Sequence, residues 1–183
     1  MTSAPAVSPD DVLTFWRQAG PSRWFAKDEA FDATFRQRFE AAHEAAASGR
    51  LAAWEESADG ALALLVLLDQ FPRNAYRGTA RMFATDAQAL DLAKRAVERA
   101  FPQSVEPGLR GFFHLPFSHS EELADQRRAV ELNADADANW LHFARIHLEV
   151  IERFGRFPHR NAVLGRVTTP AEQQFLDEGG FAG

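Results

Sequence analysis

Residues 61–74 read Ala-Leu-Ala-Leu-Leu-Val-Leu-Leu-Asp-Gln-Phe-Pro-Arg-Asn and are the most informative stretch of this 183-residue chain. The stretch opens with apolar residues that would cover every side of a helix, which predicts a central helix that is buried all round. A proline pushes the residue before it out of the α conformation, so we expect this helix to end at Phe71. The polar residues that follow would then project from the end of a buried helix.

Elsewhere the apolar residues recur at helical spacing, and no stretch shows the sustained alternation of strands. Phe31, Phe35 and Phe39 predict a long helix over residues 28–48. Further helices are expected over residues 85–100, over residues 109–114 with a stop at Pro116, from Ser118 or His119 to Leu132, and over residues 135–154. We therefore predict an all-α fold, an irregular antiparallel helical array of about 8–10 helices, several of them short.

Three helix starts carry capping sequences. Ser8 is followed by a proline and two acids, whereas Thr85 and Thr169 are followed three residues later by Gln88 and Glu172. In a capping box the first side chain accepts a hydrogen bond from the backbone of the first turn, and the later side chain reaches back to the cap. We expect a helix to begin at each of the three positions.

Length and composition fit a single helical domain over residues 1–183, with residues 1–7 and 179–183 as flexible ends. The chain is 46% hydrophobic, but no apolar run approaches the roughly 18–20 residues that span a bilayer. Residues 1–9 lack the basic start and apolar stretch of a signal peptide. We expect a cytoplasmic protein that does not contact membranes.

Composition and missing motifs exclude several classes of function. The chain has no cysteine, which removes disulfides, thiolate nucleophiles and cysteine-ligated metals. Its net charge of −6 argues against general nucleic-acid binding, which depends on a basic surface. The glycine-rich dinucleotide and phosphate loops and the serine-hydrolase elbow are also missing. We expect no cofactor.

The polar end of the first stretch returns later in the chain. Asp69-Gln70-Phe71-Pro72-Arg73-Asn74 is matched by Gly155-Arg156-Phe157-Pro158-His159-Arg160-Asn161, and each follows an apolar run. We predict that two helix ends deliver matching Arg–Asn pairs to one pocket. Guanidinium forks suit a carboxylate or a phosphate, so a small anionic ligand is expected. The candidate ligand-binding residues are Arg73, Asn74, Arg77, Arg156, Arg160, Asn161 and Arg166.

A third polar segment, Ser118-His119-Ser120-Glu121, is expected at a helix start and could form a further wall of the pocket. A histidine beside a carboxylate is the smallest set of side chains that can carry out general acid–base catalysis. The candidate catalytic residues are His119, Glu121 and His159, with either histidine as proton carrier and Glu121 as its orienting group. Asp69, Asp125, Gln126 and His147 are candidate supporting residues, with Asp125 one helical turn beyond Glu121.

His147 has a second interpretation, because it lies on the apolar face of the expected helix over residues 135–154. A lone histidine in that position is commonly a hydrogen-bonded core residue. His114, His119, His147 and His159 could in principle ligate a metal, but their spacing matches no known metal motif. We therefore predict no metal site.

Several motifs of the chain resemble a bacterial family that is catalogued as domain of unknown function 924. The motifs are Val12-Leu13-x-Phe15-Trp16, Trp24-Phe25, residues 67–74, Arg77-Gly78-Thr79-Ala80, His119-Ser120-Glu121, Asp125-Gln126 and residues 153–166. They occur in order over nearly the whole chain. The resemblance implies an all-helical fold of the tetratricopeptide (TPR-like) type in a bacterial protein, and it implies no settled activity.

Three interpretations of the polar residues stay open at this point. The first is a pocket for a small anionic molecule, with cofactor-independent acid–base chemistry as its enzymatic form. The second is a TPR-like module in which the Arg–Asn pairs grip the backbone or terminal carboxylate of a peptide or protein. The third is an internal network of ion pairs that only fixes the helix packing.

Overall fold

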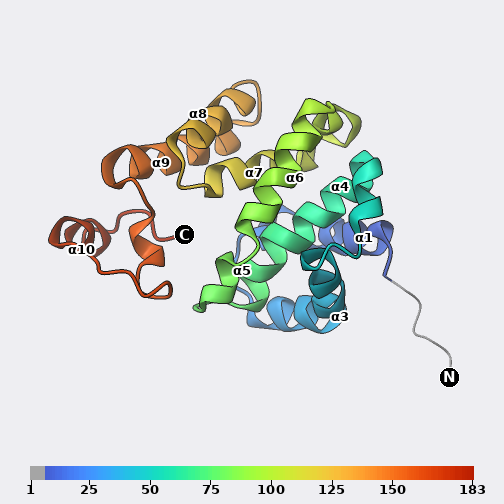
Figure 1. The fold of residues 1–183 in the computed structure, drawn as a ribbon, viewed down its shortest axis with the longest axis horizontal. Coiled ribbons are helices and arrows are strands. Elements are labelled where there is room, and N and C mark those ends of the chain that lie inside the picture. The colour runs from blue at the N-terminus through green and yellow to red at the C-terminus, as the bar shows by residue number, and fades with distance from the viewer. Residues whose placement is uncertain (1–6) are drawn as a thin grey trace. The chain divides into compact units, whose positions relative to one another are not determined.

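The computed structural model describes residues 7–183, and every regular element in that range is a helix (Figure 1). The prediction of an all-α fold is confirmed. Within the described range, no helix is both long enough and apolar enough to cross a membrane. The expectations of a flexible end and of no signal peptide concern mainly residues 1–6, which lie outside the described residues.

The helices gather into two compact units. Unit 1 is Met1–Arg77 with Arg81–Phe113, and unit 2 is Gly78–Ala80 with His114–Gly183. The single domain over residues 1–183 and the TPR-like type of array stay predictions.

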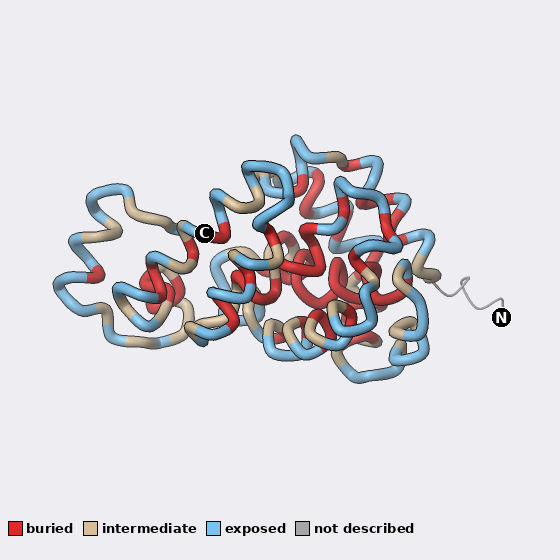
Figure 2. The backbone as a smooth tube through the Cα atoms, turned by 90° about the horizontal axis from the view of Figure 1, so that it is seen from above, coloured by how far each residue is buried: buried red, intermediate tan, exposed pale blue. Residues whose placement is uncertain are grey.

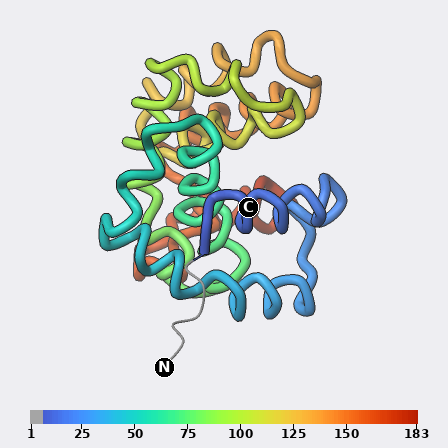
Figure 3. The backbone as a smooth tube through the Cα atoms, turned by 90° about the vertical axis from the view of Figure 1, so that its right-hand side faces the viewer, coloured from blue at the N-terminus to red at the C-terminus, as the bar shows by residue number. Residues whose placement is uncertain are grey.

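Unit 1 is built around the stretch of residues 61–74. Every residue from Gly60 to Pro72 is buried, and buried residues are red in Figure 2. The chain path through unit 1 can be followed from blue to green in Figure 3. Its elements are α1 (Pro9–Ala19), α2 (Pro21–Trp24), α3 (Glu29–Ala47), the 3₁₀ helix η1 (Ala52–Glu56), α4 (Ala58–Leu65), the π-helix η2 (Val66–Gln70), α5 (Phe71–Ala75), α6 (Asp86–Glu98), and the 3₁₀ helices η4 (Phe101–Ser104) and η5 (Pro107–Leu109).

Two further helices cross the boundary between the units along the chain. The 3₁₀ helix η3 (Ala80–Phe83) begins at the last residue of unit 2's first segment and continues into unit 1, and α7 (Gly111–His119) leads from unit 1 into the second segment of unit 2. Unit 2 continues with α8 (Leu123–Leu132), α9 (Ala138–Phe154), the 3₁₀ helix η6 (Pro158–Arg160) and α10 (Pro170–Asp177). Its α8 and α9 pack against each other.

The core of unit 1 is aromatic. Phe15 stacks on Phe31 and on Phe35, with ring centroids 5.2 Å apart in each pair. Phe71 meets Phe35 edge to face at 5.1 Å. Such pairs add about 0.5–1.5 kcal/mol each to the burial of the rings themselves. The predicted stripe of phenylalanines on α3 is therefore the surface that receives the central helix.

The central helix does not end at Phe71, which corrects the prediction made from Pro72. The chain passes through the π-helix η2 and continues directly as α5, with Pro72 in its first turn. A proline lacks the N–H that would bond to the carbonyl four residues earlier, here Leu68. The Thr85 hydroxyl donates to that carbonyl instead, and His43 Nδ1 lies 2.9 Å from the neighbouring Leu67 carbonyl. Side chains from α3 and from the start of α6 thus replace the missing backbone donors.

The same contact corrects the expected capping box at Thr85. Its side chain makes no capping bond to α6, because its hydroxyl is committed to Leu68. The predicted N-cap at Ser8 and the predicted capping box at Thr169 are confirmed, and both positions show the two reciprocal bonds of a capping box. α9 ends at Gly155 in the left-handed conformation, with φ of +67°.

The helix boundaries near Pro116 also differ from expectation. α7 runs through Pro116 to His119, and α8 begins only at Leu123, so His119 and Glu121 do not lie at a helix start. The Gln126 side-chain amide donates to the carbonyls of Ser118 (2.7 Å) and Ser120 (2.6 Å). These bonds satisfy the carbonyl groups at the end of α7 and hold the connection to α8.

The Thr85 contact gives a test of this fold. We expect Thr85→Val to lower the free energy of unfolding by about 1–3 kcal/mol, because it leaves a buried carbonyl without a donor while keeping the side-chain shape. Thr85→Ser keeps the hydroxyl, so its free energy of unfolding should fall clearly less than that of Thr85→Val. Urea denaturation of the three proteins measures the difference. Equal stability of the valine and serine variants would contradict this role of Thr85.

Candidate functional site

The first Arg–Asn pair lies in unit 1, within a set of carboxylates. Arg73 donates to both oxygens of Asp86, at 2.8 and 3.0 Å, and lies 3.2 Å from Asp69. Burial opposes the charge of this guanidinium, but Asp69 and Asp86 outweigh burial and raise the pKa of Arg73. Asn74 donates to Asp32 at 2.7 Å, and Arg77 bonds to the same carboxylate at 2.7 Å. These three predicted ligand-binding residues are therefore engaged by their own unit.

The second motif, residues 155–161, lies in unit 2, and two of its side chains, Arg156 and Asn161, share one carboxylate. Arg156 makes two bonds to Glu172, at 2.6 and 2.8 Å, and a third to the Val167 carbonyl at 2.7 Å. The Asn161 amide donates to Glu172 at 3.2 Å, and the Thr169 backbone N–H does so at 2.7 Å. The hydrogen bond from Arg156 is the main cause that lowers the pKa of Glu172 to about 2, against the opposing effect of burial.

Glu121 joins the third polar segment to the second motif. Arg166 donates to its two carboxylate oxygens at 2.8 and 2.9 Å, and the Phe157 N–H donates at 2.9 Å. Burial raises the pKa of Glu121, but these donors together with nearby Arg160 outweigh burial and lower it. The predicted convergence of residues 119–121 with residues 156–166 is thus present within unit 2. A role of Glu121 in orienting a catalytic histidine stays a prediction.

Three histidines and one arginine gather at this place, and we name His119, His147, His159 and Arg160 the His–Arg cluster. The His119 and His147 rings lie 6.0 Å apart between centroids. Arg160 donates to the His119 carbonyl at 3.0 Å, and its guanidinium lies 4.5 Å from the centre of the Phe157 ring. Phe157 in turn lies 5.6 Å from both His147 and His159.

His147 is the buried centre of the His–Arg cluster. Its Nδ1 donates to the Phe143 carbonyl at 2.6 Å, one turn earlier on α9. Burial lowers its pKa to about 3, assisted by the positive charge of His119 and then of Arg160 and His159. His147 is therefore neutral at pH 7, in agreement with its interpretation as a hydrogen-bonded core residue.

Asp125 and Gln126 hold the chain next to the His–Arg cluster. Ser120 Oγ donates to Asp125 at 2.8 Å, and Gln126 binds the carbonyls described above. The expected helical pair of Glu121 with Asp125 is wrong, because Glu121 precedes α8 while Asp125 lies in its first turn.

Sequence reasoning missed Asp32, Asp86 and Phe181, and gave Glu172 only a capping role. Asp32 stands between Phe31 and Phe35, where a polar residue beside a buried stripe could have signalled a buried partner. Asp86 follows Thr85, and an acid in the first turn of a helix is already accounted for by the helix dipole. Nothing in the sequence around Phe181 indicates that its ring packs 4.4 Å from His147.

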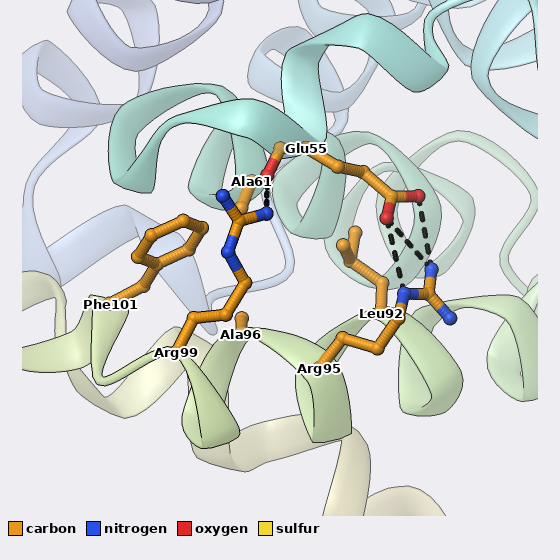
Figure 4. A pocket seen from close by; sticks show the side chains of 7 residues that line it. All are labelled: Glu55, Ala61, Leu92, Arg95, Ala96, Arg99 and Phe101. Carbon is orange, nitrogen blue, oxygen red and sulfur yellow. Dashed lines mark hydrogen bonds and ion pairs between the residues drawn. The ribbon is translucent and has the colours of Figure 1, made fainter.

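Two cavities lie away from the predicted ligand-binding residues. One in unit 1, shown in Figure 4, has a volume of about 50 Å³, and its arginines are engaged: Arg95 with the Glu55 carboxylate and Arg99 with the Glu55 carbonyl. One in unit 2 has a volume of about 180 Å³ and is lined by Ile146, Glu149, Val150, Arg153, Phe175 and Phe181. Among the described residues, no group of three or more histidines, aspartates or glutamates is placed to hold a metal ion.

The two Arg–Asn ends belong to different units, so their meeting in one pocket stays a prediction. Within each unit the polar residues do meet. A family model described as "Bacterial protein of unknown function (DUF924)" matches residues 12–180. The chain belongs to this family. The resemblance noted in its sequence motifs is therefore confirmed.

A solved structure supports the same conclusion. "Structure of Protein of Unknown Function ATU0120 from Agrobacterium tumefaciens" is 53% identical to this chain, covers 93% of it and 97% of its own length, and has a TM-score of 0.92. A search of curated proteins finds no match. The family and the Agrobacterium protein are both described as being of unknown function, so the function of this chain has to be argued from its residues.

The Glu172 contacts predict a pH dependence. The pKa of Glu172 in the folded protein is about 2, below its ordinary value of 4.5, so its stabilising effect is complete above pH 4.5 and is lost as the pH falls towards 2. We expect Glu172→Gln to be less stable at pH 7 and to lose less stability across that acidic window. Thermal melting at a series of pH values measures both effects. Glu152→Gln, at an exposed site on α9, is the control and should melt like the natural protein throughout. A Glu172→Gln curve parallel to that control would contradict the assignment.

Proposed function

We propose that unit 2 binds a small anionic molecule, a carboxylate or a phosphate, at the His–Arg cluster. The observation that carries this proposal is the grouping of His119, His159 and Arg160 around the neutral His147. All three depress the pKa of that imidazole through their positive charge. A place where a buried guanidinium and two further imidazoles converge beside an uncharged ring favours an anion, because the charge of the guanidinium is weakly screened there and the imidazoles can donate hydrogen bonds.

The polar atoms of the His–Arg cluster suit this ligand. Arg160 is 6% exposed and is held by the His119 carbonyl and by the Phe157 ring, which fixes its orientation. His119 and His159 are half-buried, and so less buried than Arg160. A fixed guanidinium with adjacent imidazoles resembles the donor sets that proteins use for carboxylates and phosphates.

The same residues could carry chemistry. His119 and His159 carry imidazoles, the side chains that enzymes use most often as general acids and bases, and a bound anion beside them would be placed for such chemistry. We propose this cofactor-independent chemistry as the enzymatic form of the site. The other predicted ligand-binding arginines and asparagines take a structural role in this proposal, since each already bonds a carboxylate of its own unit.

Two further predictions from the sequence stay proposals. One is a cytoplasmic location, which fractionation of cells that contain the protein would test. The other is a peptide or protein partner as the alternative ligand, which would be recognised through a carboxylate at the same cluster.

The experiment is a titration with inorganic phosphate and with acetate, followed by NMR of the imidazole resonances. We expect shifts of His119 and His159, and an affinity about tenfold or more weaker in Arg160→Gln, because a charged hydrogen bond is lost. Arg145→Gln, an exposed charge change on α9, is the matched control and should bind like the natural protein.

Arg160 is buried, so its variant must first be shown to fold by its melting curve. If Arg160→Gln unfolds, His159→Gln replaces it, since His159 is only half-buried and its loss should also weaken binding. Imidazole resonances that stay unchanged at tens of millimolar anion would overturn the proposal. Equal affinities in the Arg160 and Arg145 variants would do so too.

A further inference from the structure

The Phe181 ring packs on the His–Arg cluster. It follows α10 in a segment without regular structure and places its ring 4.4 Å from His147 and 5.4 Å from His159, between centroids. It also lies 6.3 Å from Phe157. An aromatic ring thus occupies the position beside the two imidazoles at which a ligand of the cluster would have to lie.

The turn before Phe181 depends on two glycines. Gly179 has a φ of +80°, which favours glycine, and its neighbour Gly180 packs so closely that an added Cβ would lie 2.5 Å from the Phe175 ring. The Gly180 N–H bonds to the Phe175 carbonyl at 2.9 Å. In the described part of the chain, no backbone hydrogen bond holds Phe181 or the two residues after it. Ring packing is therefore the main restraint on Phe181, and its displacement would break few polar bonds.

The other side of Phe181 borders the cavity of about 180 Å³ in unit 2. A cavity of roughly 150 Å³ is large enough to take up benzene, so this space can accept one aromatic ring. It is smaller than the roughly 300 Å³ of typical ligand pockets. If the Phe181 ring moved from the imidazoles into this cavity, the space beside His147 and His159 would open, and the ring would keep apolar contact with Val150 and Phe175.

We propose that the ligand of unit 2 is an aromatic acid, and that Phe181 is an internal occupant of the position its ring would take. This inference rests on the proposed function of the His–Arg cluster. The anionic group of the ligand binds Arg160 and its neighbouring histidines. The ligand ring packs on His147 and Phe157 in place of the Phe181 ring, which shifts towards Ile146 and Val150. The unliganded site is thereby kept closed by its own chain.

The test compares benzoate, acetate and benzyl alcohol as probes of the natural protein and of Phe181→Ala, with imidazole NMR as the readout. Benzoate should bind about tenfold more tightly to Phe181→Ala, because the competing ring is gone. The affinity for acetate, which has no ring, should differ by less than about twofold between the two proteins. Benzyl alcohol should bind more weakly than benzoate to both proteins, because it lacks the charge. Phe143→Ala removes an aromatic ring that is 51% exposed on α9, and as the control it should alter none of the three affinities.

The outcomes separate this inference from the function on which it rests. If neither acetate nor benzoate shifts the imidazoles of any variant, the proposed anion site itself fails. If acetate binds but the affinity for benzoate is no higher in Phe181→Ala than in the natural protein, the inference of an aromatic acid as ligand is wrong, while the proposed anion site stands. Phe181 also packs on the core of unit 2, so Phe181→Leu serves if the alanine variant unfolds. Leucine keeps an apolar side chain at this position but removes the ring. The affinity for benzoate should still rise several-fold more in Phe181→Leu than the affinity for acetate. An unchanged benzoate affinity would overturn the inference.

Discussion

A guanidinium that is drawn out of water is stabilised by a carboxylate beside it, and such ion pairs fix chain segments in both units. Without the partner, an isolated buried charge costs far more than a domain can spare. Arg73 is matched by Asp69 and Asp86, Arg156 by Glu172, and Arg166 by Glu121. Every one of these pairs joins segments within a single unit. The polar motifs that stand out in the sequence are therefore the points at which each unit fixes its own helices.

A second constraint comes from Pro72 in the middle of the most buried helix. Its missing N–H would leave the Leu68 carbonyl without a donor in a fully apolar setting. The backbone forms a π-helix just before Pro72, and the Thr85 hydroxyl donates to the Leu68 carbonyl. This contact also positions the start of α6, where Asp86 meets Arg73. Two adjacent residues therefore have two separate roles: Thr85 bonds the free carbonyl of Leu68, and Asp86 pairs with Arg73.

The sequence predicted the helical class, the buried helix and the family, because periodic apolar residues and capping boxes are local signals. It failed at Phe71, Thr85 and Pro116 for one reason. At each point local rules predicted an end or a cap, whereas side chains from other segments changed the outcome: Thr85 bonds the Leu68 carbonyl, and Gln126 bonds the carbonyls at the end of α7. Residues 119–121 and 156–166 were correctly expected to meet. The carboxylates Asp32 and Asp86 were missed, since pairing across tens of residues leaves no local pattern.

Arg73 is the most buried of the three arginines whose ion pairs fix chain segments in the two units. The most direct test is the free energy of unfolding of Arg73→Ala, measured by chemical denaturation beside Arg36→Ala, whose exposed ion pair with Glu40 serves as reference. We predict a loss of about 3–5 kcal/mol for Arg73→Ala, because two carboxylates are left facing each other without their cation. For Arg36→Ala we predict a loss of at most about 1 kcal/mol. Equal and small losses in the two variants would contradict the structural role of Arg73.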